Sequence, residues 1–132
     1  NLYDRAVFEK DLLPVCEKHG VGVINFYALA AGFLTGKYRT QADVGKSARG
    51  AKTVSLYLND RGLKILAALD KVAERVHAKQ SEVAIAWLLT RPTIASPIAS
   101  ASNLDQLQSL IRAASLKLDA EALKTLEAAS AE

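Results

Sequence analysis

Residues 21–26 (Val-Gly-Val-Ile-Asn-Phe) place the strongest constraint on how this chain folds. The run is short, rich in β-branched residues and free of polar alternation, which is typical of a strand buried on both faces in a parallel sheet. A helical stretch over residues 5–20 comes directly before it and ends at Gly20, a residue suited to terminate a helix. Helix, glycine and buried strand form half of a βαβ unit, so the sequence predicts an α/β fold.

The rest of the chain predicts further helices and one more strand. An amphipathic helix of about 18 residues is expected from Asp60, and an apolar helix is expected to start at a Ser81 cap and to stop before Pro92. Residues 93–99 form the second expected strand. Two more helices are expected after it, with Ser102 capping the first of them.

A polar, irregular segment over residues 38–58 is expected to form a long loop, and such loops inside a domain are usually functional or disordered. Small residues fill the loop after each expected strand. The second loop leads into a helix N-terminus at residues 102–106, where backbone amides and the helix dipole favour anions. Lys37 and Arg49 add charged partners for a phosphate. These features predict a nucleotide or phosphorylated ligand, and ordinary connections with solvated cations are the alternative.

Composition argues against several classes of protein. No apolar run reaches the roughly 18–20 residues of a membrane-spanning helix, and a net charge of +3 with 6% aromatic residues argues against a nucleic-acid-binding surface. Cys16 is the single cysteine, so we expect no disulfide framework and no cysteine-based zinc site, and we expect Cys16 to fill an apolar space. Residues 1–5 do not resemble a secretory signal, which favours the cytoplasm.

Several motifs, in order along essentially the whole chain, resemble the C-terminal portion of an aldo-keto reductase. They occupy residues 1–5, 29–38, 47–50, 83–88, 91–93 and 98–103. The resemblance implies a (β/α)8 barrel that reduces aldehydes and ketones, small-molecule carbonyl substrates, with NADPH extended across the C-terminal ends of the strands. Such a barrel has about 250 residues, so residues 1–132 correspond to the C-terminal segment of one domain, with about two parallel strands and incomplete as a barrel on its own.

The resemblance also implies cofactor-binding residues. Phe26 corresponds to an aromatic residue near the end of strand seven, often beside the nicotinamide. Lys37 corresponds to a lysine near the diphosphate and ribose, and Arg49 to an arginine of a flexible cofactor-covering loop, residues 38–58. The loop that wraps the diphosphate corresponds to Tyr27, Ala28, Leu29, Ala30 and Ala31, with Gly32 allowing close approach. The loop and helix start that hold the 2′-phosphate and adenine correspond to Ser100, Ser102, Asn103 and Gln106.

The family's catalytic Asp, Tyr, Lys and His belong to the first half of the barrel. We therefore expect no catalytic residue in this chain, no activity from the isolated chain, and weak or no NADPH binding by it. Residues 27–29 read Tyr-Ala-Leu where the family usually has Ser-Pro-Leu, and residues 109–110 read Ser-Leu in place of a Glu-Asn pair that holds adenine. Ser100 replaces a glycine. Altered adenine contacts are expected.

A non-catalytic helical remnant or an oligomerising interaction module derived from the same barrel is the alternative function. Two strands cannot close a barrel, and the apolar faces of residues 21–26 and 81–90 would lie open, which favours self-association. The chain could also be the ordered or cleaved part of a full enzyme. The serine-rich segment 100–103 favours NADPH over NADH, and the substrate is not encoded in this portion.

Overall fold

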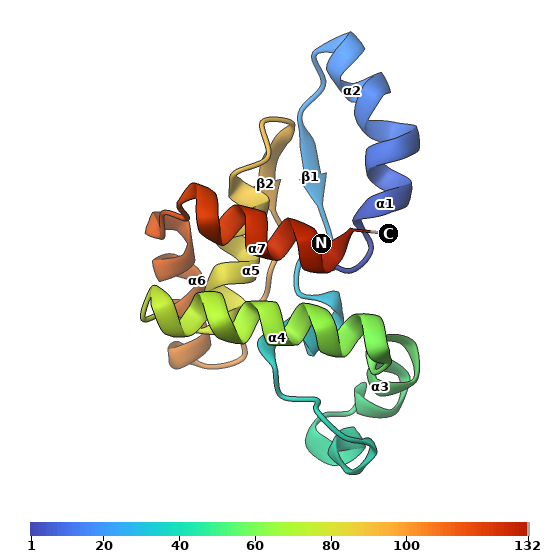
Figure 1. Cartoon of the computed structure of the whole chain (residues 1–132), viewed down its shortest axis with the longest axis vertical. Coiled ribbons are helices and arrows are strands. Elements are labelled where there is room, and N and C mark those ends of the chain that lie inside the picture. The colour runs from blue at the N-terminus through green and yellow to red at the C-terminus, as the bar shows by residue number, and fades with distance from the viewer. Residues whose placement is uncertain (132) are drawn as a thin grey trace.

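The computed structural model describes residues 1–131 and consists mainly of helices around two short strands (Figure 1). Strand β1 (Val23–Asn25) pairs in parallel with β2 (Ile94–Pro97), with one irregularity in register after Val23. Both strands lie within the segments that the sequence predicts. The helix-rich α/β class with parallel strands, consistent with part of a (β/α)8 barrel, is confirmed.

The helical stretch before β1 is continuous but not uniform. It consists of α1 (Arg5–Val7), a π-helical turn η1 (Phe8–Leu12) and α2 (Leu13–His19). Pro14 lies in the first turn of α2, directly after the π-helical turn, and proline is tolerated in the first turn of a helix. Gly20 ends the stretch in the left-handed conformation at φ 63°, as predicted.

Two pairs of packed helices form most of the rest. The helices are α4 (Asp60–Arg75), α5 (Gln80–Leu89), α6 (Leu104–Ser115) and α7 (Ala120–Ser130). α4 packs against α7 and α5 packs against α6, while α5 also supports β2. Because α5 packs against α4, α6 and β2, each of its residues from 82 to 88 is buried, so the open apolar face that the oligomerising alternative expects at residues 81–90 is not found.

Trp87 lies at the centre of this core and is 1% exposed. The guanidinium carbons of Arg5 and Arg91 lie 4.9 Å and 4.4 Å from its ring centre. Arg5 also donates to Ser130 at 3.0 Å and Arg91 pairs with Glu127, so the indole joins α1 and α5 to α7 through these two cations.

Three expectations about burial and loops are wrong. Ile24 is 63% exposed, so β1 is not buried on both faces, because no described element covers the face from which this side chain projects. The expected loop over residues 38–58 contains a 3-10 helix η3 (Gln41–Lys46) and helix α3 (Gly50–Tyr57), and Val54 and Tyr57 anchor α3 in the core. Cys16 is half-buried rather than a core filler, because α2 packs on little else.

Two predicted caps are displaced by one or two residues. α5 begins at Gln80 with Lys79 as its N-cap, and the Lys79 N–H donates to Glu82 Oε2 at 3.1 Å, so Ser81 is not the cap. α6 is capped by Asn103, whose Oδ1 accepts the N–H of Gln106 at 2.9 Å, rather than by Ser102. Serine and asparagine are both good caps. Asn103 is the cap here because its backbone is extended, as an N-cap residue requires, and the helix starts at the next residue.

Candidate functional site

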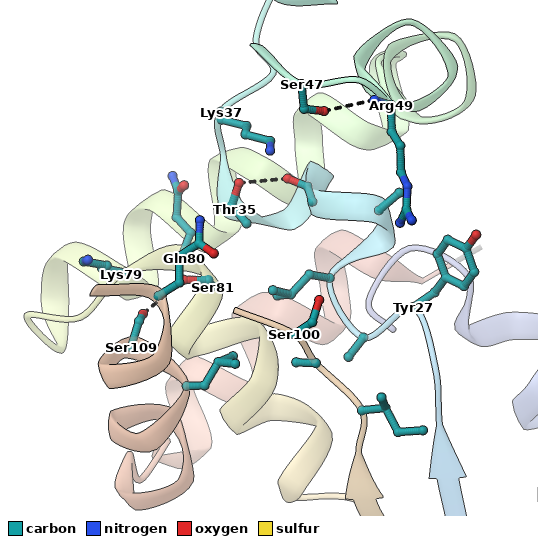
Figure 2. Close-up of a pocket in the computed structure, with 18 of the residues that line it drawn as sticks. Tyr27, Thr35, Lys37, Ser47, Arg49, Lys79, Gln80, Ser81, Ser100 and Ser109 are labelled. Atoms are coloured by element: carbon teal, nitrogen blue, oxygen red, sulfur yellow. Dashed lines mark hydrogen bonds between the residues drawn. The ribbon is translucent and has the colours of Figure 1, made fainter. Parts of the chain in front are cut away.

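The loops that follow β1 and β2 border a groove of about 1120 Å³, the first groove (Figure 2). Parallel strands bring their carboxyl ends to the same end of a sheet, which is where α/β proteins bind ligands. Most of the site residues expected from the sequence line this groove together. They are Phe26, Tyr27, Ala28, Leu29, Ala31, Gly32, Lys37, Arg49, Ser100 and Gln106.

The backbone after β1 is strained. Tyr27, Ala30, Ala31 and Gly32 all have positive φ, at 55°, 48°, 54° and 89°. Residues with side chains adopt this conformation rarely, and such strain gathers at functional sites. The carbonyl of Leu29 accepts the N–H of Gly32 at 2.9 Å and holds the turn, which opens the 3-10 helix η2 (Ala30–Thr35). The N–H groups of Ala30 and Gly32 are both bonded to backbone carbonyls, so they fix the shape of the turn and are not free for a ligand.

Ala30 is the one residue of this loop that does not line the first groove. It is fully buried beneath the turn, with its N–H donating to the carbonyl of Tyr27 at 2.8 Å. Its small side chain fits where a larger one would displace the loop from the core. Ala30 therefore supports the loop from behind.

Two cations face the first groove, Lys37 and Arg49, and within residues 1–131 neither has a carboxylate partner (Figure 2). Lys37 Nζ lies 5.1 Å from the centre of the Tyr38 ring, and a Cβ on Gly32 would come within 3.3 Å of Lys37 Cε, so the glycine leaves room for this side chain. Arg49 directly precedes α3 and extends toward the side of the groove where Tyr27 lies. Two unpaired positive charges at one end of the groove attract a phosphate or diphosphate.

The opposite end of the first groove is polar, but its charges are paired. Lys79 Nζ lies 2.8 Å from Asp105 Oδ2, and this hydrogen bond holds the pKa of Asp105 below its usual value. Ser102 and Asn103, which were expected at this end, do not line the groove. Both are engaged in the start of α6, where the Ser102 N–H donates to Gln106 Oε1 at 2.8 Å.

Ser109 also lines this end, and its hydroxyl is already engaged. It donates to the buried carboxylate of Glu82 at 2.8 Å, which also accepts from the Arg112 guanidinium. Burial acts to raise the pKa of Glu82, but the hydrogen bonds from Ser109, the Lys79 N–H and Arg112 outweigh burial and hold that pKa below its usual value. The carboxylate is therefore ionised and occupied, and it does not accept a hydrogen bond from a ligand in the groove.

Sequence reasoning missed the wall formed by the start of α5 and by neighbouring polar residues. These are Thr35, Ser47, Asp70, Lys79, Gln80 and Ser81. Gln80 donates a hydrogen bond to Asp70. The Asp70 carboxylate also accepts hydrogen bonds from both terminal nitrogens of Arg39, at 2.8 Å and 2.7 Å. These bonds hold this wall of the groove in place. The available signal was the predicted helix start at residue 81, because a helix N-terminus near two strand ends is a natural ligand wall.

Tyr57 is not suited to act as an acid catalyst. Burial, together with the nearby Asp4 carboxylate that accepts its hydroxyl at 3.0 Å, raises the pKa of Tyr57 to about 12. A tyrosine general acid needs a pKa that is lowered toward the working pH.

Within residues 1–131 no group of three or more His, Cys, Asp or Glu side chains is placed to hold a metal ion. No helix among these residues has the length and apolar character needed to cross a membrane.

A second groove, of about 1140 Å³, lies between the N-terminal helices and β1. Its walls come from α1, η1 and α2 on one side and from residues 23–27 and α3 on the other. Phe26, Tyr27, Ala31 and Arg49 line both grooves, so the two share a wall.

Comparison with known protein families gives one match over nearly the whole chain. The model of the aldo/keto reductase family matches residues 1–131. A match of this extent shows the family.

Individual relatives agree with the family match. The chain is 32% identical over 118 residues to L-glyceraldehyde 3-phosphate reductase of Escherichia coli K12, covering 86% of this chain and 34% of the relative. It is 31% identical over 118 residues to an uncharacterized oxidoreductase of Bacillus subtilis, and the match covers 89% of this chain and 35% of that relative. It is 29% identical over 117 residues to a probable voltage-gated potassium channel subunit beta of Arabidopsis thaliana, and the match covers 86% of this chain and 36% of that relative. The chain thus spans about a third of the length of these relatives.

Proposed function

The chain belongs to the aldo/keto reductase family, and from this premise we propose that it is the cofactor-binding C-terminal part of an oxidoreductase that reduces aldehydes or ketones with NADPH. The observation that carries the proposal is the pair of unpaired cations, Lys37 and Arg49, beside the left-handed turn after β1. A dinucleotide carries its negative charge on a diphosphate, and this end of the first groove matches that charge.

The first groove has a place for each part of an extended dinucleotide. Lys37 would hold the diphosphate beside the turn after β1, and Arg49, which directly precedes α3, would cover it. Phe26, which is 72% exposed at the end of β1, offers an aromatic face for the nicotinamide. Ser100 and Gln106 would contact the adenosine end. When bound, the cofactor supplies the hydride, and these residues hold and orient it.

The adenosine end favours a phosphorylated ribose only weakly. Residues 100–103 contain no arginine, and Ser102 and Asn103 are engaged in the start of α6. Ser100 and Lys79 both line the groove, but Asp105 pairs with Lys79. We infer a preference for NADPH over NADH that is smaller than an arginine would give.

The isolated chain is proposed to be inactive. The family resemblance places the catalytic Asp, Tyr, Lys and His in the part of the barrel that this chain does not match, and the raised pKa of Tyr57 disfavours a local substitute. A small carbonyl compound is the substrate class for the complete barrel, and a cytoplasmic location belongs to the same proposal.

Titration with NADPH tests the proposal. Calorimetry is expected to give a dissociation constant well above the micromolar range, and NMR at high NADPH concentration is expected to shift the signals of Gly32, Lys37 and Arg49. Arg49→Ala should weaken binding by about tenfold or more, since a charged hydrogen bond contributes about 1.5–3 kcal/mol. Lys71→Ala is the matched control, because Lys71 is exposed on α4 and lines neither groove.

Two outcomes would contradict the proposal. Shifts confined to residues outside the first groove would show that the cofactor is held elsewhere. Micromolar binding that Arg49→Ala does not weaken would show that the two cations have no role in holding the diphosphate.

An oligomerising module is the second candidate function, favoured by large apolar side chains that lie in solvent. Ile24, Leu104 and Ile111 are each more than 60% exposed. Sedimentation velocity of the chain alone tests this function: a monomer at all concentrations would exclude it.

A further inference from the structure

The two cations of the first groove lie on either side of one compact loop, residues 38–47. Lys37 directly precedes this loop, and Arg49 follows it at the start of α3. Both cations line the first groove, so the loop returns to the region from which it leaves. Loops of this kind are packed by their own side chains and are frequently functional. The contacts between the two ends of loop 38–47 therefore set how the two charges lie relative to each other.

A pair of hydroxyl groups joins the two ends of this loop. Tyr38 Oη and Ser47 Oγ lie 2.6 Å apart, and either atom can donate the hydrogen bond. Tyr38 is fully buried in the core. A buried phenol needs a hydrogen-bond partner, and Ser47 supplies it. The bond therefore attaches the far end of the loop to a residue that the core holds in place.

Each of these two residues also contacts one of the cations. Ser47 Oγ accepts the N–H of Arg49 at 3.3 Å (Figure 2). Lys37 Nζ lies 5.1 Å from the centre of the Tyr38 ring, and the face of an aromatic ring attracts a cation. A single hydrogen bond between hydroxyl groups therefore connects the contacts that hold the two charges.

Lys46 and Asp43 fix the backbone at the start of the loop. Lys46 Nζ donates to the carbonyl of Lys37 at 2.8 Å and lies 2.8 Å from Asp43 Oδ1. Asp43 Oδ2 accepts the N–H groups of Arg39 and Thr40, at 2.7 Å and 2.8 Å. The start of the loop is thus fixed by its own contacts, and the hydroxyl pair determines how the far end meets it.

We propose that Tyr38 and Ser47 are positioning residues, whose hydroxyl bond holds Lys37 and Arg49 so that both charges face one diphosphate in the first groove. The inference rests on the proposed cofactor role of the two cations. Tyr38 is buried and does not line the groove, so it acts through its neighbours. Long cationic side chains lose much rotamer freedom when they are ordered, and fixing them before the ligand arrives lowers the cost of binding.

Titration with inorganic pyrophosphate, followed by NMR at the signals of Lys37 and Arg49, tests the proposal. Tyr38→Phe and Ser47→Ala should each weaken binding by about three- to tenfold, the value of one ordinary hydrogen bond. The double variant should bind no more weakly than either single variant, because both substitutions remove the same bond. Ser47 lines the groove and Tyr38 does not, so Tyr38→Phe is the decisive variant.

Two further variants separate positioning from a general loss of structure. Ser47→Thr keeps the hydroxyl, and the extended backbone at Ser47 suits a β-branched side chain, so this variant should bind like the wild type. Tyr3→Phe is the matched control. It removes a phenol hydroxyl that accepts a hydrogen bond from Asn59 Nδ2 at 2.8 Å, and Tyr3 lines neither groove, so the affinity should not change.

Three results would overturn the proposal. They are an unchanged affinity in Tyr38→Phe, additive losses in the double variant, and a loss in Tyr3→Phe equal to that in Tyr38→Phe.

The backbone order parameter of Arg49, measured without ligand, distinguishes this inference from the proposed function. Tyr38→Phe should lower it from the range of rigid backbone, roughly 0.85, toward that of flexible backbone, below about 0.6, and Tyr3→Phe should not. A wild-type chain that binds no pyrophosphate would contradict the proposed function, and the order parameter would then decide whether the hydroxyl pair orders Arg49. An unchanged order parameter in Tyr38→Phe would overturn the inference.

Discussion

The Glu82 carboxylate on α5 accepts two hydrogen bonds from the Arg112 guanidinium on α6, at 2.9 Å from Nε and 2.7 Å from Nη2. Ser109 donates to the same oxygen at 2.8 Å. Glu82 is 4% exposed, so its carboxylate is shielded from water, whereas the Arg112 side chain is 49% exposed. These hydrogen bonds join α5 to α6 directly behind one end of the first groove.

Replacing this carboxylate should therefore loosen the pair of helices. Glu82→Gln is expected to lower the free energy of unfolding by about 1–3 kcal/mol, because Arg112 and Ser109 lose a charged acceptor. Urea unfolding followed by circular dichroism measures the change. Glu74→Gln, on the exposed face of α4, is the control and should change stability by less than about 0.5 kcal/mol. Equal effects of the two substitutions would show that the buried bonds contribute nothing.

The same carboxylate predicts how stability depends on pH. The pKa of Glu82 is lowered in the folded chain, so the unfolded chain binds more protons and stability falls with falling pH. The contribution is present above the ordinary value of 4.5 and is lost as the pH falls from there through the lowered value. Asp105 and Asp119 shift in the same direction but are exposed and contribute less.

Urea midpoints measured between neutral pH and about pH 3 test this dependence. Glu82→Gln should flatten the acid limb of the curve, because its side chain does not titrate. An acid limb of unchanged slope in Glu82→Gln would assign the dependence to other carboxylates.

Two glycines of the segment 38–58 make a matched pair. A Cβ on Gly50 would collide with the carbonyl oxygen of Val44, a backbone atom that cannot turn aside, whereas a Cβ on Gly45 would meet nothing within 4 Å. Gly50→Ala should lower the free energy of unfolding by about 1–3 kcal/mol and weaken NADPH binding, because it displaces the start of α3 beside Arg49. Gly45→Ala should leave both within experimental error. Unfolding by urea and titration with NADPH provide the measurements.

Tyr27 occupies a position where a much smaller residue was expected from the family resemblance. Its ring packs edge-to-face on Phe26 with 5.3 Å between centres, and it lines both grooves. Tyr27→Ser should strengthen NADPH binding severalfold by clearing the path of the diphosphate, whereas Tyr27→Phe, which keeps the ring, should leave it unchanged. NMR titration measures both. Equal affinities of the two variants would show that the ring does not obstruct the cofactor.

Local chemistry explains what the sequence could predict of the fold. Gly20 ends a helix because its left-handed conformation suits glycine, and Asp119 caps α7 by accepting the N–H of Ala122 at 2.8 Å, as its position in the sequence indicates. α3 escaped prediction because its buried face consists of a few residues, Val54 and Tyr57 among them, within a polar segment. Its helicity depends on packing against the core, which local pattern does not report.

The candidate site likewise has one part that local sequence pattern could predict and another part that depends on tertiary packing. The loop after β1 could be located because small residues follow a β-branched run. Lys37 and Arg49 are singled out by the family resemblance, since Arg39, Lys46 and Lys52 are cations of the same segment. The wall formed by Lys79 and Gln80 depends on α5 pointing its start at the two strand ends, and this is a property of the tertiary arrangement. The exact roles of these residues toward a cofactor stay predictions.

The indole of Trp87, stacked between Arg5 and Arg91, equips this chain with an optical reporter. It is the only tryptophan, so intrinsic emission excited at the red edge comes from one ring in one environment. That ring is in contact with the first helix through one guanidinium and is tied to the last helix through the other. Emission wavelength and quenching therefore report, without any label, whether the two ends of the polypeptide are still assembled on the same core.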